Sequence, residues 1–332
     1  MNRRTFLRDA MLALATGTCA AGTCLSLPSQ TRARRDVLDA AAFHASRRFV
    51  TLECGDVAYV ERGSGDVALF LHGFPLNGFQ WRGAIERLAA QRRCIAPDFL
   101  GLGHTRVAQE QSVAPAAQVA MLVALLDALA IDAVDLIAND SGGAIAQLLV
   151  AGHPHRVRSL LLTNCDSERE CPPAALQPVI ELSRRGEFVD RWMAPWLADK
   201  VLARSTEGIG GMCYADPAQP TDAAIETYFA PLVATPRSKA LVHAYAMALE
   251  HNALADIGTA LGRSAVPLRI VWGDADTIFT PANADYLAAS FGNSRGVRRL
   301  RHSKLFWPEE RPDVIEHEAL SLWRSCTTGH GI

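Results

Sequence analysis

The feature that most constrains this sequence is a tight turn between two apolar runs. Residues 133–138 are rich in the apolar side chains of a buried strand, and residues 144–151 form a run of Ala, Leu and Ile typical of a helix. Residues 138–143, which join them, read Ala-Asn-Asp-Ser-Gly-Gly. Small side chains on both sides of an apex let the backbone fold back on itself. The pattern therefore predicts a nucleophile elbow, in which one side chain is held exposed on a strained strand-to-helix turn.

Two residues compete for the apex of this turn. An elbow has the form small-x-nucleophile-x-small. With Asp140 at the apex, the two small positions hold Ala138 and Gly142. With Ser141 at the apex, the first small position holds Asn139, which fits the pattern less well. We therefore predict that Asp140 is the nucleophile, with Ser141 as the alternative and a glycine-pair loop without chemistry as a third interpretation.

Length and charge restrict the kind of protein that carries this turn. The chain has 332 residues, of which 49% are hydrophobic, and a formal net charge of -2. These values suit one enzyme-sized domain with an insertion and a sizeable core. The near-neutral charge, without a basic stripe, argues against nucleic acid as the main partner. We expect a small-molecule substrate.

The first 33 residues have the pattern of an export signal. Arg3 and Arg4 stand in a segment that resembles the twin-arginine motif, and the uncharged residues 10–27 follow it. Residues 31–33 offer small side chains at the usual cleavage positions. We expect residues 1–33 to be a signal peptide for the twin-arginine export machinery. The product would be periplasmic or secreted, without a stable membrane span, and a retained N-terminal anchor is the alternative.

The cysteines outside this signal match no metal-binding motif. The chain has eight cysteines, two of which fall in the signal, and this leaves six. An oxidising compartment permits disulfides, but the spacing fits no metal site. Cys171 and Cys213 fall in the same predicted insertion and could pair. We expect no metal and no organic cofactor.

Apolar runs alternate with helical patterns through the rest of the chain. The runs at residues 67–71 and 157–164 are continuous, as expected for central strands of a parallel sheet. At residues 168–257 the strand pattern stops, and helical patches with aromatic side chains take its place. The sequence therefore predicts an α/β fold with a parallel, doubly wound sheet at residues 34–167 and 258–332, interrupted by a helical insertion.

Two segments after the first central run resemble a known family. Residues 72–75 read His-Gly-Phe-Pro, and Trp81-Arg82 follows shortly after. In these segments the chain resembles the α/β-hydrolase superfamily, specifically its haloalkane dehalogenase and epoxide hydrolase branch. The resemblance implies a mostly parallel sheet flanked by helices, with a helical cap as the insertion. It also implies that the backbone N–H groups of Phe74 and Ser141 form an oxyanion hole.

The insertion is similar to the cap that roofs the active site in this family. It carries Trp192, Tyr214 and Tyr245, which we expect at the substrate pocket. Epoxide hydrolases need cap tyrosines as acids. Tyr214, Tyr228 and Tyr245 are available for that role.

The same resemblance assigns an acid and leaves the base open. Residues 272–276 read Trp-Gly-Asp-Ala-Asp, which is similar to the family's loop for the acidic triad member, and this implies Asp276. Asp166 is the second choice for the acid. After the final strand, Leu305 stands at the position where members of the family carry the catalytic histidine. His302, three residues earlier, is the nearest candidate base, and a structural or exposed His302 is the alternative.

The resemblance implies a two-step hydrolysis. In this family an aspartate attacks carbon, displaces halide or opens an epoxide, and a His–acid pair then activates water to hydrolyse the ester. Here that implies a covalent alkyl–enzyme ester on Asp140. Haloalkane dehalogenases usually have Trp after the nucleophile and fluoroacetate dehalogenases have Arg, whereas this chain has Ser141. The leaving group therefore stays open, as do two alternatives: a serine esterase using Ser141, and a hydrolase-fold binding protein that lost its histidine.

Overall fold

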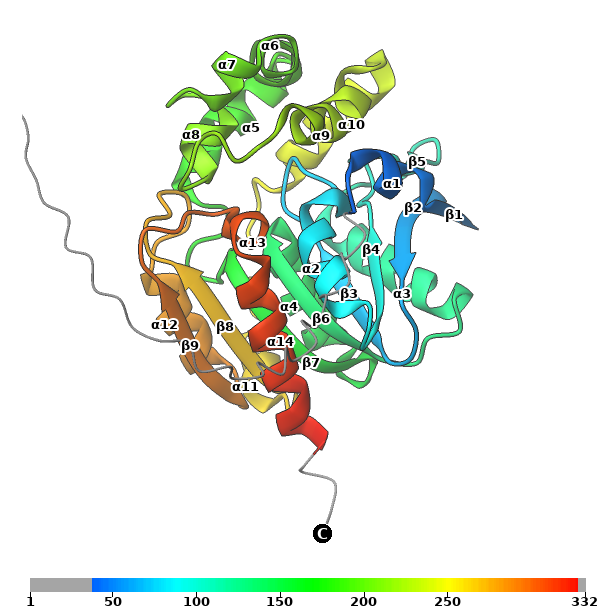
Figure 1. The fold of residues 1–332 in the computed structure, drawn as a ribbon, viewed down its shortest axis with the longest axis vertical. Coiled ribbons are helices and arrows are strands. Elements are labelled where there is room, and N and C mark those ends of the chain that lie inside the picture. Colours follow the sequence, from blue (N-terminus) through cyan, green and yellow to red (C-terminus); the bar gives the residue numbers. More distant parts are fainter. Residues whose placement is uncertain (1–37, 328–332) are drawn as a thin grey trace, which may run out of the picture. The chain divides into compact units, whose positions relative to one another are not determined.

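The structure, a computed structural model, describes residues 38–327, and the predicted signal peptide lies outside them. The strands of the described residues form one nine-stranded sheet in the order β1-β2-β4-β3-β6-β7-β8-β9, with β5 paired to β2 (Figure 1). The strands are β1 (Arg47–Leu52), β2 (Gly55–Arg62), β3 (Val67–Leu71), β4 (Arg93–Pro97), β5 (Arg106–Val107), β6 (Val134–Asp140), β7 (Val157–Cys165), β8 (Leu268–Gly273) and β9 (Ser294–Leu300).

The sheet is parallel through its centre and antiparallel at one edge. Strands β4, β3, β6, β7, β8 and β9 run parallel to one another, whereas β2 pairs antiparallel with β1, β4 and β5. Strands β3 and β6 are buried along their whole length, as expected where helices cover both faces of a parallel sheet. The parallel, doubly wound sheet predicted from the apolar runs is confirmed.

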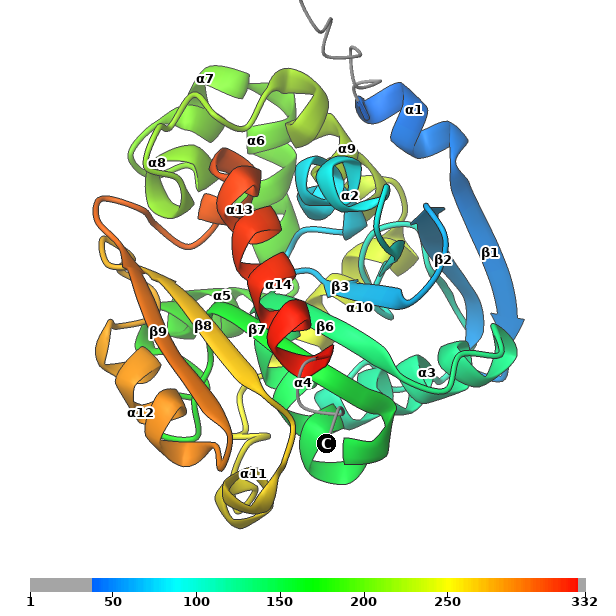
Figure 2. The same cartoon turned by 60° about the horizontal axis from the view of Figure 1, so that its bottom comes forward.

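Helices flank this sheet. They are α1 (Ala40–Ala45), α2 (Arg82–Leu88), α3 (Pro115–Ala128), α4 (Ser141–Gly152), α11 (Gly258–Arg263), α12 (Ala282–Ser290), α13 (Trp307–Glu310) and α14 (Pro312–Thr327). Helix α4 packs against β6 and β7, whereas α14 packs against β7 and α2. Figure 2 shows α14 lying across the sheet in front of β6 and β7.

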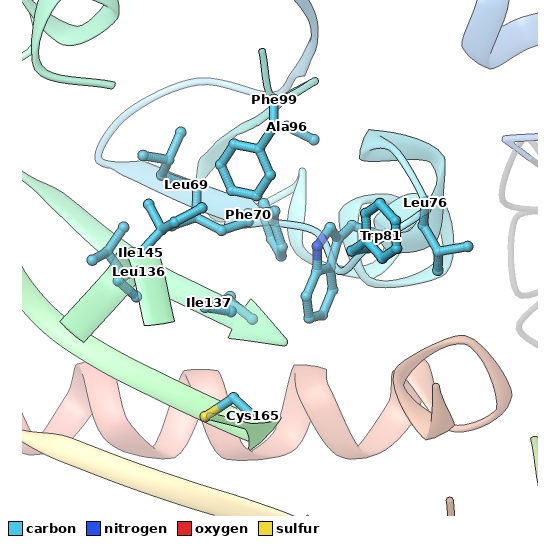
Figure 3. Packing of buried hydrophobic residues seen from close by; sticks show 14 of the residues in the cluster. Leu69, Phe70, Leu76, Trp81, Ala96, Phe99, Leu136, Ile137, Ile145 and Cys165 are labelled. Carbon is cyan, nitrogen blue, oxygen red and sulfur yellow. The ribbon is translucent and has the colours of Figure 1, made fainter. Parts of the chain in front are cut away.

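The core beside β6 is filled by side chains from neighbouring strands. Leu69 and Phe70 of β3 pair in register with Leu136 and Ile137 of β6, and Figure 3 shows these residues in the core. The ring of Trp81 lies 5.7 Å from that of Phe70, measured between centroids. Burying apolar surface contributes roughly 25 cal/mol per Å². This packing therefore holds β6 firmly, and with it the turn at its end.

Between β7 and β8 the chain forms helices and turns, apart from one isolated bridge. Before α11, the α-helices of this segment are α5 (Gln177–Arg184), α6 (Ala194–Ala198), α7 (Lys200–Arg204), α8 (Ile209–Cys213), α9 (Asp222–Val233) and α10 (Pro236–Ala248), with a π-helical turn at Val189–Met193. We call α5–α10 the cap, and Figure 1 shows these helices gathered at the top of the view. Within residues 38–327, no helix is both long and apolar enough to cross a membrane.

The cysteines of the described residues are all free thiols. Cys171 and Cys213, which the sequence left open as a pair, are among them. Cys94 and Cys165 are buried in β4 and β7, so these two thiols serve as small apolar side chains of the core.

Candidate active site

The turn between β6 and α4 concentrates its strain at Asp140. This residue has φ 56° and ψ −135°, which is a costly conformation for a residue with a side chain. A Cβ on Gly142 would lie 2.5 Å from a backbone oxygen of the loop after β3. A Cβ on Gly143 would lie 2.3 Å from the Cβ of Cys165. The two glycines are therefore needed for close packing, and Ser141 already belongs to the helix.

Two backbone amides converge on one oxygen of the Asp140 carboxylate. The N–H of Phe74, in the loop after β3, donates to Oδ1 at 3.2 Å. The N–H of Ser141 donates to the same oxygen, and neither amide donates to Oδ2. These are the two amides that the family resemblance implies for an oxyanion hole, and the structure brings them together around the carboxylate. Paired amides of this kind stabilise negative charge on the oxygen between them.

Burial sets the protonation of Asp140. The residue is 8% exposed, and burial raises its pKa to about 7 because loss of water penalises the charged form. The amides of Ser141 and Phe74 lower this pKa, while the charge of Asp276 raises it. Near neutral pH, Asp140 therefore exists as a mixture of carboxylic acid and carboxylate.

Asp276 lies in the loop after β8 and is held by an amide side chain. Asn164 Nδ2 donates to Asp276 Oδ2 at 2.8 Å, and the N–H of Ile278 donates to Oδ1 at 2.8 Å. Burial raises the pKa of Asp276 to about 6 in spite of these donors. Asn164 is fixed in turn, because its Oδ1 accepts the N–H of Gly273 at 2.8 Å. The structure thus brings Asp276 within electrostatic reach of Asp140, with Asn164 as its side-chain partner.

The loop after β9 presents an aliphatic side chain where the resemblance places a histidine. Leu305 is buried and lines the cavity described below. His302 lies in the turn directly after β9, with a φ of 64° and an exposed side chain, and is not part of the cavity wall. The structure does not bring His302 together with Asp140 and Asp276, because this turn leaves the imidazole in solvent.

Two buried histidines elsewhere accept hydrogen bonds from the backbone. His72 Nε2 accepts the N–H of Phe99 at 3.0 Å, and burial lowers the pKa of His72, which keeps it neutral. His243 Nε2 accepts the N–H of Val189 at 3.3 Å. Among residues 38–327, no histidine lines the cavity.

A cavity of about 210 Å³ lies at the turn between β6 and α4. An apolar cavity of about 150 Å³ is known to hold benzene in another protein, so this volume suits a small organic molecule. The polar residues on its wall are Asp140, Ser141, Asp166, Cys213 and Thr277. Its apolar residues come from the cap and from loops of the sheet, and include Leu176, Val179, Phe188, Trp192, Trp196, Met212, Phe74, Ile278, Phe279, Leu305 and Phe306.

The predicted pocket residues differ in where they lie. Trp192 lines the cavity, but Tyr214 and Tyr245 do not. The Tyr214 hydroxyl donates to Glu309 Oε1 at 2.6 Å, and Glu309 also pairs with a guanidinium of α2 at 2.6 Å. That buried ion pair draws Tyr214 away from the cavity. The Tyr228 hydroxyl accepts from the same guanidinium at 3.2 Å.

Tyr245 stands behind Ser141. Its hydroxyl lies 3.2 Å from Ser141 Oγ, and its ring stacks on Phe74 with centroids 5.3 Å apart. A serine nucleophile needs a base hydrogen-bonded to its Oγ. Burial raises the pKa of Tyr245 above its ordinary value, so this hydroxyl stays protonated and is a poor base for Ser141.

Three polar wall residues lie outside the pocket set that the sequence predicts. Asp166 is predicted there only as a second choice for the triad acid, and Cys213 and Thr277 have no predicted role in the site. The position of Asp166 is a usable signal, because it directly follows β7 and strand ends carry ligand-contacting groups in α/β sheets. Within the described residues, no group of three or more His, Cys, Asp or Glu side chains could hold a metal ion.

Comparison with known families gives a match to most of the folded chain. A family model described as the alpha/beta hydrolase fold matches residues 67–301. The epoxide hydrolase CorEH, solved without ligand, has a TM-score of 0.69 and 21% sequence identity, and the match covers 84% of this chain and 98% of that one. At this identity the likeness shows the fold alone.

Two curated relatives match over shorter stretches. A haloalkane dehalogenase of Mesorhizobium japonicum is 43% identical over 111 residues, which cover 31% of this chain and 34% of the relative. A 2-hydroxy-6-oxo-2,4-heptadienoate hydrolase of Pseudomonas putida is 37% identical over 103 residues, which cover 30% of this chain and 37% of the relative. The chain thus spans about a third of the length of these relatives.

Proposed function

The chain belongs to the α/β-hydrolase fold family, and from this membership we propose that it is a hydrolase whose Asp140 carboxylate attacks a carbon atom of a small apolar substrate. The attack forms a covalent alkyl–enzyme ester as a halide leaves or an epoxide opens. The main support for the proposal is the turn itself, where the strained residue is Asp140 and its Oδ1 accepts hydrogen bonds from two backbone N–H groups.

These amides suit both steps of such a reaction. With Oδ1 held by Phe74 and Ser141, Oδ2 is the oxygen that attacks carbon. In the resulting ester, Oδ1 is the carbonyl oxygen. When water adds to the ester, Oδ1 becomes an oxyanion that already lies between two N–H donors. A single arrangement of the turn therefore serves ester formation and ester hydrolysis.

In this proposal Asp276 does not orient a histidine, as a triad acid would, but acts on Asp140 through its charge. Its carboxylate is held by Asn164, and its charge raises the pKa of Asp140. His302 is not retained as the base, because its side chain is exposed in the turn after β9. The pocket contact retained from the cap is Trp192.

Leu305 favours a second candidate function, a hydrolase-fold protein that binds its ligand without turnover. A leucine carries no base to activate water, so a substrate would be bound, or trapped as an ester, and kept. A serine esterase is less well supported, because Ser141 Oγ has a tyrosine hydroxyl as its neighbour.

Mass spectrometry of the intact protein separates these functions. The protein is incubated with bromobutane or epoxybutane, quenched over a time course, and digested to map any adduct. The proposal predicts an alkyl adduct on the peptide that contains Asp140, together with multiple turnovers of product. A parallel incubation with nitrophenyl butyrate tests the esterase, which an acyl adduct on Ser141 would establish instead. Saturable binding of the first two probes without turnover, with or without a stable Asp140 adduct, would establish the binding protein.

We further propose that the chain is exported by the twin-arginine route to the periplasm or beyond. Arg3 and Arg4, followed by an uncharged segment at residues 10–27, support this proposal. Replacing both arginines with lysine should keep the protein in the cytoplasm in a cell-fractionation assay. Unchanged export of the double variant would contradict it.

A further inference from the structure

Asp166 lies next to Asp140 in a place that the reaction above leaves unused. It follows Cys165, the last residue of β7, which pairs in register with Asp140. Neighbouring strands are about 4.8 Å apart. Cys165 points toward α4, where a Cβ on Gly143 would lie 2.3 Å from its own. Asp166, directly after the strand, lies on the cavity wall together with Asp140.

Asp166 is the wall residue suited to acid–base chemistry beside Asp140. Among the described residues, the wall carries these two carboxyl groups and neither a histidine nor a tyrosine. Burial raises the pKa of Cys213, so its thiol stays neutral. Asp166 is 6% exposed, and Gln147 Nε2 donates to its backbone oxygen at 2.9 Å. That bond fixes the main chain, while the carboxyl has the thiol of Cys171 as its side-chain partner.

The two carboxyl groups have different surroundings. Asp140 accepts two backbone amides, which favour its charged form. Asp166 has the thiol of Cys171 as a weaker donor, and burial together with the charge of Asp140 raises the pKa of Asp166 well above its ordinary range. Two carboxyl groups that share a site divide into one charged and one protonated member. The amides make Asp140 the charged member and leave Asp166 protonated.

We infer that Asp166 is the general acid and general base of this cavity, and that the native substrate has an oxygen leaving group of the epoxide type. The inference rests on the proposed function of Asp140. In the first step, Asp140 Oδ2 forms a bond to an epoxide carbon and the C–O bond breaks. The leaving oxygen takes the proton of Asp166, which gives a hydroxyalkyl ester on Asp140 and a carboxylate on Asp166.

The second step returns both groups to their starting states. The Asp166 carboxylate takes a proton from water as the water oxygen adds to the ester carbonyl, and the oxyanion forms on Oδ1. The adduct then collapses, and the departing alkoxide takes the proton back from Asp166 to give a diol. Asp140 is left as a carboxylic acid and passes its proton to Asp166. The net reaction is epoxide plus water to diol.

The charges of the wall favour an oxygen leaving group over a halide. A halide leaves as an anion and needs neutral or positive donors around it. Among the described residues, the wall carries two carboxyl groups and no cationic side chain, and the Ser141 hydroxyl already has Tyr245 as a partner. Thr277 and the indoles of Trp192 and Trp196 are its other neutral donors. An epoxide oxygen instead needs a proton as it leaves, and a protonated carboxylic acid supplies one.

The test compares Asp166→Asn with the parent on two probes, epoxybutane and bromobutane. Asparagine keeps the volume of the side chain and the backbone bond to Gln147, but neither donates nor takes a proton in the reaction. Asp274→Asn, whose carboxylate pairs with Arg299 outside the wall, is the matched control. Asp166→Glu keeps the acid and should recover part of any lost activity. Ester adducts and products are followed over time by mass spectrometry.

In Asp166→Asn, we expect diol formation from epoxybutane to fall at least about 100-fold, the usual scale of a lost acid–base group. Bromobutane, whose bromide leaves without a proton, should still alkylate Asp140, and that ester should persist. Epoxide turnover within about threefold of the parent would overturn the role of Asp166 while leaving Asp140 in place. Absence of an Asp140 adduct with either probe, in both proteins, would overturn Asp140 as well.

Discussion

The turn after β6 and the loop after β9 both reach the cavity, but they present opposite chemistry to it. The turn carries a strained aspartate with two amides on one oxygen. The loop carries Leu305 and Phe306, which are both buried and apolar. The first region therefore has the groups that the proposed ester formation needs, whereas the second has none of the groups that usually hydrolyse an ester.

This difference separates the two half-reactions of the proposed mechanism. Bond formation depends on Asp140, while ester release depends on whichever group moves protons at the wall. Leu305 stands at the position where the family resemblance places the catalytic histidine, so no imidazole connects Asp140 to Asp276. Asp276 instead accepts a hydrogen bond from Asn164. Removing the nucleophile should therefore abolish ester formation, and giving the loop a base should speed ester release.

The largest effect is expected from removing the nucleophile. Asp140→Asn keeps the size of the side chain but lacks a carboxylate, so ester formation with bromobutane should fall by roughly 10⁴ or more. Ser141→Ala is the matched control, because alanine keeps the backbone N–H that donates to Oδ1. It should alkylate within about tenfold of the parent in a quenched time course. The reverse order of the two losses would identify Ser141 as the nucleophile.

The next effect is the pH dependence of alkylation. In the proposed reaction Asp140 attacks as a carboxylate, and burial raises its pKa to about 7. Below that pH the carboxylate fraction falls about tenfold per unit, so the rate at pH 5 should be about 100-fold below that at pH 8. Asp276→Asn removes a charge that raises this pKa, so its profile should move to lower pH. A flat bromobutane profile from pH 5 to 8 would contradict the role of Asp140.

The sequence was informative where local pattern decides structure. Alternating apolar runs predicted the parallel sheet, and the small residues around Asp140 predicted the sharp turn, because both depend on neighbours in the chain. The direction of Tyr214 depends on Glu309, which lies 95 residues away and is paired with an α2 guanidinium. No local pattern reveals such a partner. The exposure of His302 likewise follows from where β9 ends, and strand ends are poorly defined by sequence.

A histidine placed in the loop after β9 should supply the missing base. Leu305→His should speed release of the alkyl ester about tenfold in the Asp166→Asn background, where release is otherwise blocked. This expected gain in release rate is smaller than a general base usually gives. The reason is that Asp276, which would orient the new imidazole, is already hydrogen-bonded to Asn164. Leu305→Met is the control for side-chain volume. Equal release rates in the two variants would show that this loop does not reach the ester.

The smallest effect is expected at Tyr245. Tyr245→Phe removes the hydroxyl beside Ser141 Oγ but keeps the ring that stacks on Phe74. Loss of one buried hydrogen bond should cost about 1 kcal/mol of unfolding free energy, measured by denaturant titration. Alkylation should change less than about threefold. If alkylation fell far more than threefold while the unfolding free energy changed by only about 1 kcal/mol, Tyr245 and Ser141 would take part in the reaction.

The covalent ester on Asp140 is tested most directly by a single turnover in water labelled with the heavy oxygen isotope. If water attacks the ester carbonyl, the labelled oxygen enters the Asp140 carboxylate, and the first product molecule carries only unlabelled oxygen from the enzyme. We therefore predict that the peptide containing Asp140 becomes heavier and that the first product does not. Label in the first product, with an unlabelled Asp140 peptide, would show that water or Ser141 acts without an Asp140 ester, and would contradict the account.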